Sequence, residues 1–84
     1  MRGRQRATLQ AIFADPVRAN IAWADVAALF IAAGASVSEG RGLRIRVSLN
    51  GVDAVFHPPH PAKETDRGAL RSVRRFLREV GVMS

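Results

Sequence analysis

The chain alternates between stretches with helical spacing of apolar residues and stretches with strand spacing, and these stretches predict the order of its elements. Over residues 22–33, Trp23, Val26 and Phe30 recur every three to four positions, which is the spacing of one helix face. Gly34 follows at the position where helices favour a left-handed C-terminal residue. We therefore predict a helix over residues 22–33.

A shorter helix is predicted before it, in the stretch TLQAIFAD that begins at Thr8. Thr8 is a suitable N-cap, and the polar residues 1–6 are expected to lie outside the helix. Asp15 precedes Pro16, and a residue before proline disfavours the helical region, so we expect this helix to end there.

The stretch RIRVSLNGVDAVFH, residues 44–57, predicts a β-hairpin. Apolar residues alternate with polar ones along its first half, and Asn50-Gly51 favours a type I′ turn that fixes the pairing register. A short strand over residues 35–39 is predicted to precede it. The expected cross-strand pairs are Leu49 with Val52, Ser48 with Asp53, Val47 with Ala54, Arg46 with Val55, Ile45 with Phe56 and Arg44 with His57.

The last predicted helix covers residues 67–80, with Asp66 as its N-cap and Gly81 after its end. Its arginines fall within about 100° of arc, at ~100° per residue, opposite its apolar face. The apolar face comprises Leu70, Val73, Phe76, Leu77 and Val80, and the arginine stripe comprises Arg67, Arg71, Arg74, Arg75 and Arg78.

This order predicts an α+β fold, in which helices pack on one face of a three-stranded antiparallel sheet and give the core two layers. We predict an N-terminal extension with a short helix over residues 1–20 and a single domain over residues 21–84.

Composition narrows the function. The chain has 84 residues and a net charge of +6, with Lys63 as its only lysine, and it has no cysteine. A positive charge favours polyanionic partners such as nucleic acid, an acidic protein or an anionic membrane surface. An arginine-rich composition is also typical of high-GC genomes, so the positions of the arginines matter more than their number. No apolar run approaches the ~20 residues of a membrane span, and we expect a cytoplasmic protein that does not enter a membrane.

Two histidines are the candidate proton carriers. Metal-free RNA cleavage needs a base near the 2′-hydroxyl, an acid near the leaving oxygen and cations around the phosphate. Histidine suits both proton roles because its unperturbed pKa is about 6.5. We predict His57 or His60 in these roles, with Arg44 beside His57; the alternative is that both histidines are structural. No third metal ligand accompanies them, so we predict no metal ion and no other cofactor.

The candidate RNA-binding residues lie on two surfaces. The hairpin and its flanking loops contribute Arg41, Arg44, Arg46 and Lys63, and the last helix contributes Arg67, Arg71, Arg74, Arg75 and Arg78. The alternatives are a solvated face or, for the helix, an acidic partner protein.

Three segments together resemble the HicA toxins of type II toxin–antitoxin systems, over residues 21–81. They are the helix IAWADVAALFIAAGA, the stretch PPHP at residues 58–61 and the closing helix RGALRSVRRFLREVGV. The resemblance implies a double-stranded-RNA-binding-like (dsRBD-like) fold, messenger RNA cleavage by an endoribonuclease, and neutralisation by a HicB-like antitoxin.

One position departs from that family. Its catalytic histidine is typically early in the second strand, and here Arg44 occupies or adjoins that place. Arginine stays protonated and cannot act as a general base, although it can bind a phosphate. The alternative function is therefore a catalytically inactive module of the same fold that binds RNA or an antitoxin.

Overall fold

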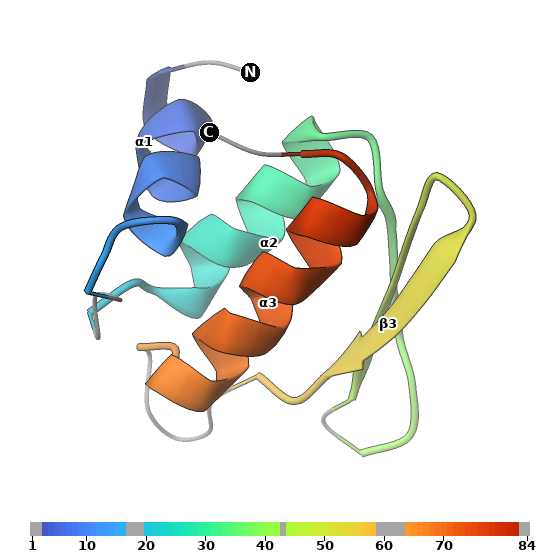
Figure 1. Cartoon of the computed structure of the whole chain (residues 1–84). Coiled ribbons are helices and arrows are strands. Elements are labelled where there is room, and N and C mark those ends of the chain that lie inside the picture. Colours follow the sequence, from blue (N-terminus) through green and yellow to red (C-terminus); the bar gives the residue numbers. More distant parts are fainter. Residues whose placement is uncertain (1–2, 17–19, 43, 59–63, 83–84) are drawn as a thin grey trace.

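The computed structural model describes residues 3–16, 20–42, 44–58 and 64–82. Its elements follow the predicted order, and the predicted α+β class is confirmed (Figure 1). They are α1 (Gly3–Ile12), α2 (Trp23–Ala32), β1 (Ser36–Glu39), β2 (Ile45–Leu49), β3 (Val52–Phe56) and α3 (Arg67–Glu79).

The sheet is antiparallel with strand order β1-β2-β3. The predicted register of the β2–β3 hairpin is confirmed from the pair Leu49–Val52 to the pair Ile45–Phe56. Asn50 and Gly51 have φ values of 52° and 78°, as a type I′ turn requires. The predicted pair of Arg44 with His57 would come next, directly beyond the last paired residues.

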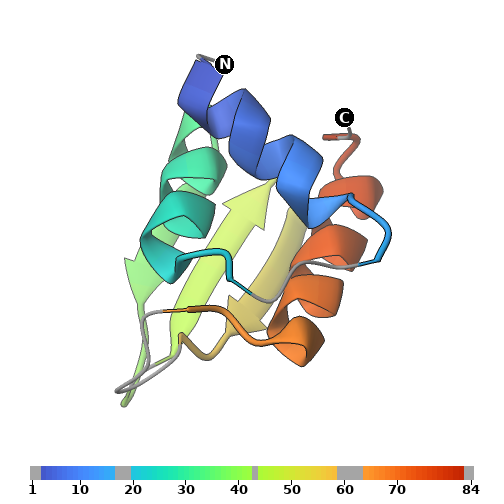
Figure 2. The same ribbon diagram turned by 90° about the vertical axis from the view of Figure 1, so that its left-hand side faces the viewer.

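The helices lie on one side of the sheet, as predicted, but in two layers. α2 and α3 cover the sheet, and α1 packs on the outer side of these two helices (Figures 1 and 2). The other face of the sheet has no helix over it among the described residues. We call it the open face.

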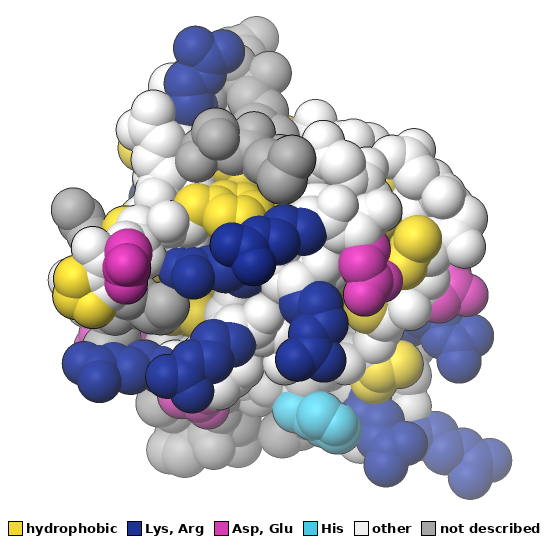
Figure 3. All heavy atoms as spheres, in the orientation of Figure 1, with side chains coloured by type: hydrophobic (Ala, Val, Ile, Leu, Met, Phe, Trp, Pro, Cys, Tyr) yellow, Lys and Arg dark blue, Asp and Glu magenta, His cyan; other side chains and the backbone are white. Residues whose placement is uncertain are grey.

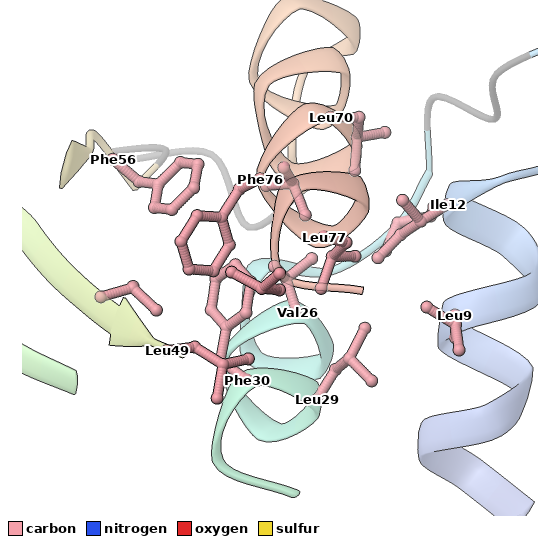
Figure 4. Packing of buried hydrophobic residues seen from close by; sticks show 14 residues of the cluster. Leu9, Ile12, Val26, Leu29, Phe30, Leu49, Phe56, Leu70, Phe76 and Leu77 are labelled. Carbon is pink, nitrogen blue, oxygen red and sulfur yellow. The ribbon is translucent and has the colours of Figure 1, made fainter. Parts of the chain in front are cut away.

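Aromatic rings form the centre of the core between the sheet and the two covering helices (Figure 4). The rings of Phe30 and Phe56 stack at a centroid distance of 5.4 Å, and Phe76 meets them edge-on at 5.7 and 5.9 Å. Trp23 is half-buried at 6.2 Å from Phe56, so it contributes to packing at the edge of this cluster.

The N-terminal helix begins earlier than the sequence predicted. α1 starts at Gly3, so Thr8 is not its N-cap but a mid-helix residue whose hydroxyl donates to the carbonyl of Arg4 at 3.1 Å. The prediction was wrong because residues 3–6 carry no apolar spacing. The helix is stabilised instead by the burial of Leu9 and Ile12 against the rest of the core.

The closing helix ends as predicted at both termini. The Asp66 carboxylate accepts a hydrogen bond from the amide of Ala69 at 2.7 Å, and Gly81 has a φ of 83°. Asn50 adds a contact that the sequence did not indicate, since its side-chain amide donates to the carbonyl of Val80 at 2.8 Å. The hairpin turn is therefore tied to the C-terminal end of α3.

Candidate functional site

Arg44 and His57 lie at the same end of the hairpin. Arg44 directly precedes β2 and His57 directly follows β3, and the two antiparallel strands pair up to Ile45 and Phe56. Both side chains are exposed. The amide of Gly40 donates to the carbonyl of Arg44 at 2.8 Å, which fixes the backbone at this position.

Further cations lie near this end of the sheet. Arg46 is exposed on the open face, where its neighbours across the strands are Ser38 and Val55. Arg41 is exposed in the loop that joins β1 to β2. We call Arg41, Arg44, Arg46 and His57 the hairpin cluster.

Asp53, an acid on the open face, is hydrogen-bonded to a neighbouring side chain. Asp53, the only acid on β2 and β3, accepts a hydrogen bond from the hydroxyl of Ser48, its predicted partner across the hairpin. It therefore lies toward the turn, away from the strand ends that carry the hairpin cluster. His60 and Lys63 fall within residues 59–63, outside the described residues, and their roles stay predictions.

The second predicted surface is the outer side of α3. Arg67, Arg71, Arg75 and Arg78 are exposed. Figure 3 shows basic side chains gathered over this helix, with a histidine side chain at the lower edge of the same view. A shallow depression there is lined by Arg71, Arg74, Arg75, Arg78 and Glu79. We call Arg71, Arg75 and Arg78 the helix cluster.

Arg74 differs from its neighbours because its Nε and Nη2 atoms already donate to backbone carbonyls. It is half-buried, and its guanidinium donates to the carbonyl of Ile12 at 2.7 and 3.1 Å and to that of Ala14 at 2.9 Å. Ile12 is the last residue of α1 and Ala14 lies two positions beyond it, so the cation satisfies acceptors at and just after a helix terminus. We therefore assign Arg74 to the junction between α1 and α3 instead of the RNA surface.

A signal for this role is present in the sequence. At ~100° per residue, Arg74 lies about 40° from Leu70 around the helix, nearer the apolar face than any other arginine of the stripe. Phe13 completes the junction, because the guanidinium carbons of Arg74 and Arg78 lie 5.8 and 5.6 Å from the centre of its ring.

The part of the chain that the structure describes holds no group of three or more His, Cys, Asp or Glu residues placed to bind a metal ion. Within the same residues, no helix has the length and apolar character needed to cross a membrane.

A protein-family model described as the HicA toxin of bacterial toxin–antitoxin systems matches residues 23–82. The match begins at the first residue of α2 and leaves α1 outside. No curated protein and no solved structure matches the chain significantly.

Proposed function

The chain belongs to the HicA toxin family, and from this premise we propose that it binds and cleaves messenger RNA without a metal ion. The observation that carries the proposal is the hairpin cluster. An exposed imidazole at the end of β3 and an exposed guanidinium at the start of β2 flank the last pair of the hairpin, Ile45–Phe56.

The proposed chemistry divides between these two groups. His57 or His60 takes the proton of the 2′-hydroxyl as this oxygen attacks the phosphorus, and a protonated imidazole returns a proton to the departing 5′-oxygen. Arg44 and Arg46 bind the phosphate and stabilise the charge that develops on its oxygens. The histidine would then come from the end of the third strand, with Arg44 at or beside the usual position in the second strand.

The helix cluster would hold the RNA backbone at a distance from the reacting phosphate. Its guanidinium groups carry charge but present no ordered base-reading amides, so the expected binding depends on phosphates and shape. RNA of many sequences should therefore bind with similar affinity.

The direct test is to incubate the purified chain with labelled messenger RNA, without metal and with chelator, from pH 5 to 9. We expect a bell-shaped cleavage profile, because one proton carrier must be free and the other charged. His57→Ala or His60→Ala should lower the rate ~100-fold or more, and Gln10→Ala, exposed on α1, should leave it unchanged. If both histidine variants cleave at the wild-type rate, this mechanism is wrong.

A second candidate function rests on Arg44 itself. If its charge has replaced the catalytic group, the chain binds RNA without cleaving it at any pH. In that case Arg44→His is expected to produce cleavage that the wild-type chain lacks, with the salt slope of RNA binding lowered by no more than the ~0.7 of one phosphate contact.

RNA binding can be measured apart from cleavage through its dependence on salt. Each phosphate contact contributes ~0.7 to the slope of log affinity against log salt for single strands. The double variant Arg71→Ala/Arg75→Ala should reduce that slope by about 1.4. An unchanged slope would remove the helix cluster from the RNA surface.

HicA toxins function in toxin–antitoxin systems, and we propose that a HicB-like antitoxin neutralises this chain. Expression of the chain should arrest growth, and co-expression of an antitoxin encoded beside it should restore growth. Growth arrest that persists with such an antitoxin would contradict this pairing.

A further inference from the structure

A groove runs between β3 and α3. One wall consists of residues 53–56 of β3, and the other carries Ser72, Arg75, Phe76 and Glu79 of α3. These helix residues are spaced by three and four positions, so they share one side of the helix. The groove has a volume of about 220 Å³, below the ~300 Å³ at which small-molecule pockets begin. Its length along a strand suits an extended chain better.

The strand wall of this groove is a free sheet edge. β3 is the last strand in the order β1-β2-β3, so among the described residues it pairs on one side only. In a hairpin with a two-residue turn, the pair that flanks the turn is hydrogen-bonded, and the following pairs alternate. Counting from Leu49–Val52, the residues Asp53 and Val55 direct their N–H and C=O groups away from β2.

We propose that an extended acidic segment of a protein partner binds in this groove and adds to β3 as a fourth strand. An edge strand flanked by a helix offers main-chain hydrogen bonds along one wall and side-chain contacts along the other. Asp53 and Val55 supply the main-chain donors and acceptors, and Arg75 supplies the cationic contact from α3. Two acids also line the groove. The Asp53 carboxylate accepts a hydrogen bond from Ser48, and Glu79 lies beside the arginines of the helix cluster, which outnumber it.

The placement of side chains explains why an acidic segment fits. A partner residue opposite Ala54 faces the same side of the sheet as Ala54, toward α3 and Arg75. Ala54 is small and half-buried, and the largely buried rings of Phe56 and Phe76 form the floor of the groove. Beyond the groove lies the depression of the helix cluster, with which it shares Arg75 and Glu79.

Charge also argues against a second copy of this chain as the occupant. Two copies that pair through β3 would bring together chains of net charge +6 and their helix clusters. Like charges at this distance repel, whereas a segment rich in Asp and Glu is attracted.

The inference rests on the proposed toxin–antitoxin function in one respect, which is that the antitoxin is then the expected partner. The groove and the free edge do not depend on RNA cleavage. The test therefore measures peptide binding and RNA binding separately, so that either can fail alone.

The probe is a synthetic eight-residue peptide of alternating glutamate and threonine, with a lysine–threonine peptide as its control. Amide hydrogen exchange of the full chain is followed by NMR at millimolar peptide. We expect the glutamate peptide to slow exchange at the amides of Asp53 and Val55, and the lysine peptide to have no effect.

Two matched proline variants test the edge. Val55→Pro removes an outward N–H while leaving the bonds to β2 intact, and should weaken peptide binding about tenfold. Val37→Pro is the control, because Val37 is an exposed valine on β1, the opposite edge strand. Val37 pairs with Val47 without a hydrogen bond between them, so its N–H also points away from the sheet. This control should bind the peptide as tightly as the wild-type chain.

Protection at Val37 and Glu39 instead of β3, or no protection at millimolar peptide, would overturn the inference. Peptide binding that survives Val55→Pro would do the same. Val55 lies opposite Arg46 but carries no charge, so Val55→Pro removes no phosphate contact and should leave the salt slope of RNA binding unchanged. If peptide binding fails while RNA binding persists, the strand-docking inference falls and the proposed function stands.

Discussion

Arg74 and Arg75 are adjacent on α3 and belong to the same stripe in the sequence, yet they have different surroundings. Arg74 faces α1, is half-buried and donates to two backbone carbonyls. Arg75 faces β3, is exposed and lines both the groove and the depression of the helix cluster. One side of α3 is therefore a structural junction, and the other is an open cationic surface.

The comparison shows that a stripe of like charges need not have one role. The guanidinium of Arg74 satisfies the carbonyls of Ile12 and Ala14, so its removal would leave partly buried acceptors without a donor. Arg75 has no protein partner among the described hydrogen bonds and ion pairs, so it is available for a phosphate or a carboxylate. Substitutions on the two sides should thus separate stability from binding.

The largest loss of stability is expected from Ile12→Ala, which leaves a cavity where α1 packs against the core. Ile12 is fully buried, and truncating a buried isoleucine to alanine costs about 3 kcal/mol of unfolding free energy. Urea unfolding measures the loss. Ile31→Ala is the control, since Ile31 is 63% exposed, and a similar loss there would show that burial does not govern the difference.

Arg74→Ala should come next, with a loss of about 2 kcal/mol of unfolding free energy. Arg74→Lys should recover only part of it, because an ammonium lacks the planar fork that reaches both carbonyls. In the same urea experiment Arg75→Ala should change stability by less than about 0.5 kcal/mol. Equal losses at the two positions would remove the distinction between the two sides of α3.

The smallest loss of stability is expected for Arg78→Ala, because Arg78 lies at the border between the junction side and the open side of α3. Arg78 is exposed and lies over the ring of Phe13 at 5.6 Å, a contact worth about 0.5 kcal/mol at an exposed site. In a double-mutant cycle, Arg78→Ala should no longer lower the unfolding free energy once Phe13→Leu has removed the ring. A loss well above 1 kcal/mol would indicate that Arg78 also belongs to the junction.

Most of the domain could be predicted from the sequence, because its signals are local. The turn at Asn50-Gly51 set the register of the hairpin, and the cap at Asp66 marked the start of α3. The start of α1 could not be predicted, because residues 3–6 have no apolar spacing and their helix depends on packing further along.

The candidate site was predicted less completely. The alternation of the strands correctly placed Arg46 on the open face, and the register brought Arg44 and His57 to one end of the hairpin. The role of Arg74 was missed because its acceptors, Ile12 and Ala14, are about sixty positions away in the chain. The groove was missed for the same reason, since its walls come from separate elements.

The sequence by itself determined the order of the elements, the register of the hairpin and the ends of the closing helix. Each of these depends on backbone preferences and side-chain spacing within a few residues. Only the tertiary structure decided which arginines are free and which edge of the sheet meets a helix. Those properties depend on which distant carbonyls, rings and strands come to lie beside α3. Local spacing indicates only that Arg74 is the arginine nearest the apolar face, and it does not identify the groups that Arg74 meets.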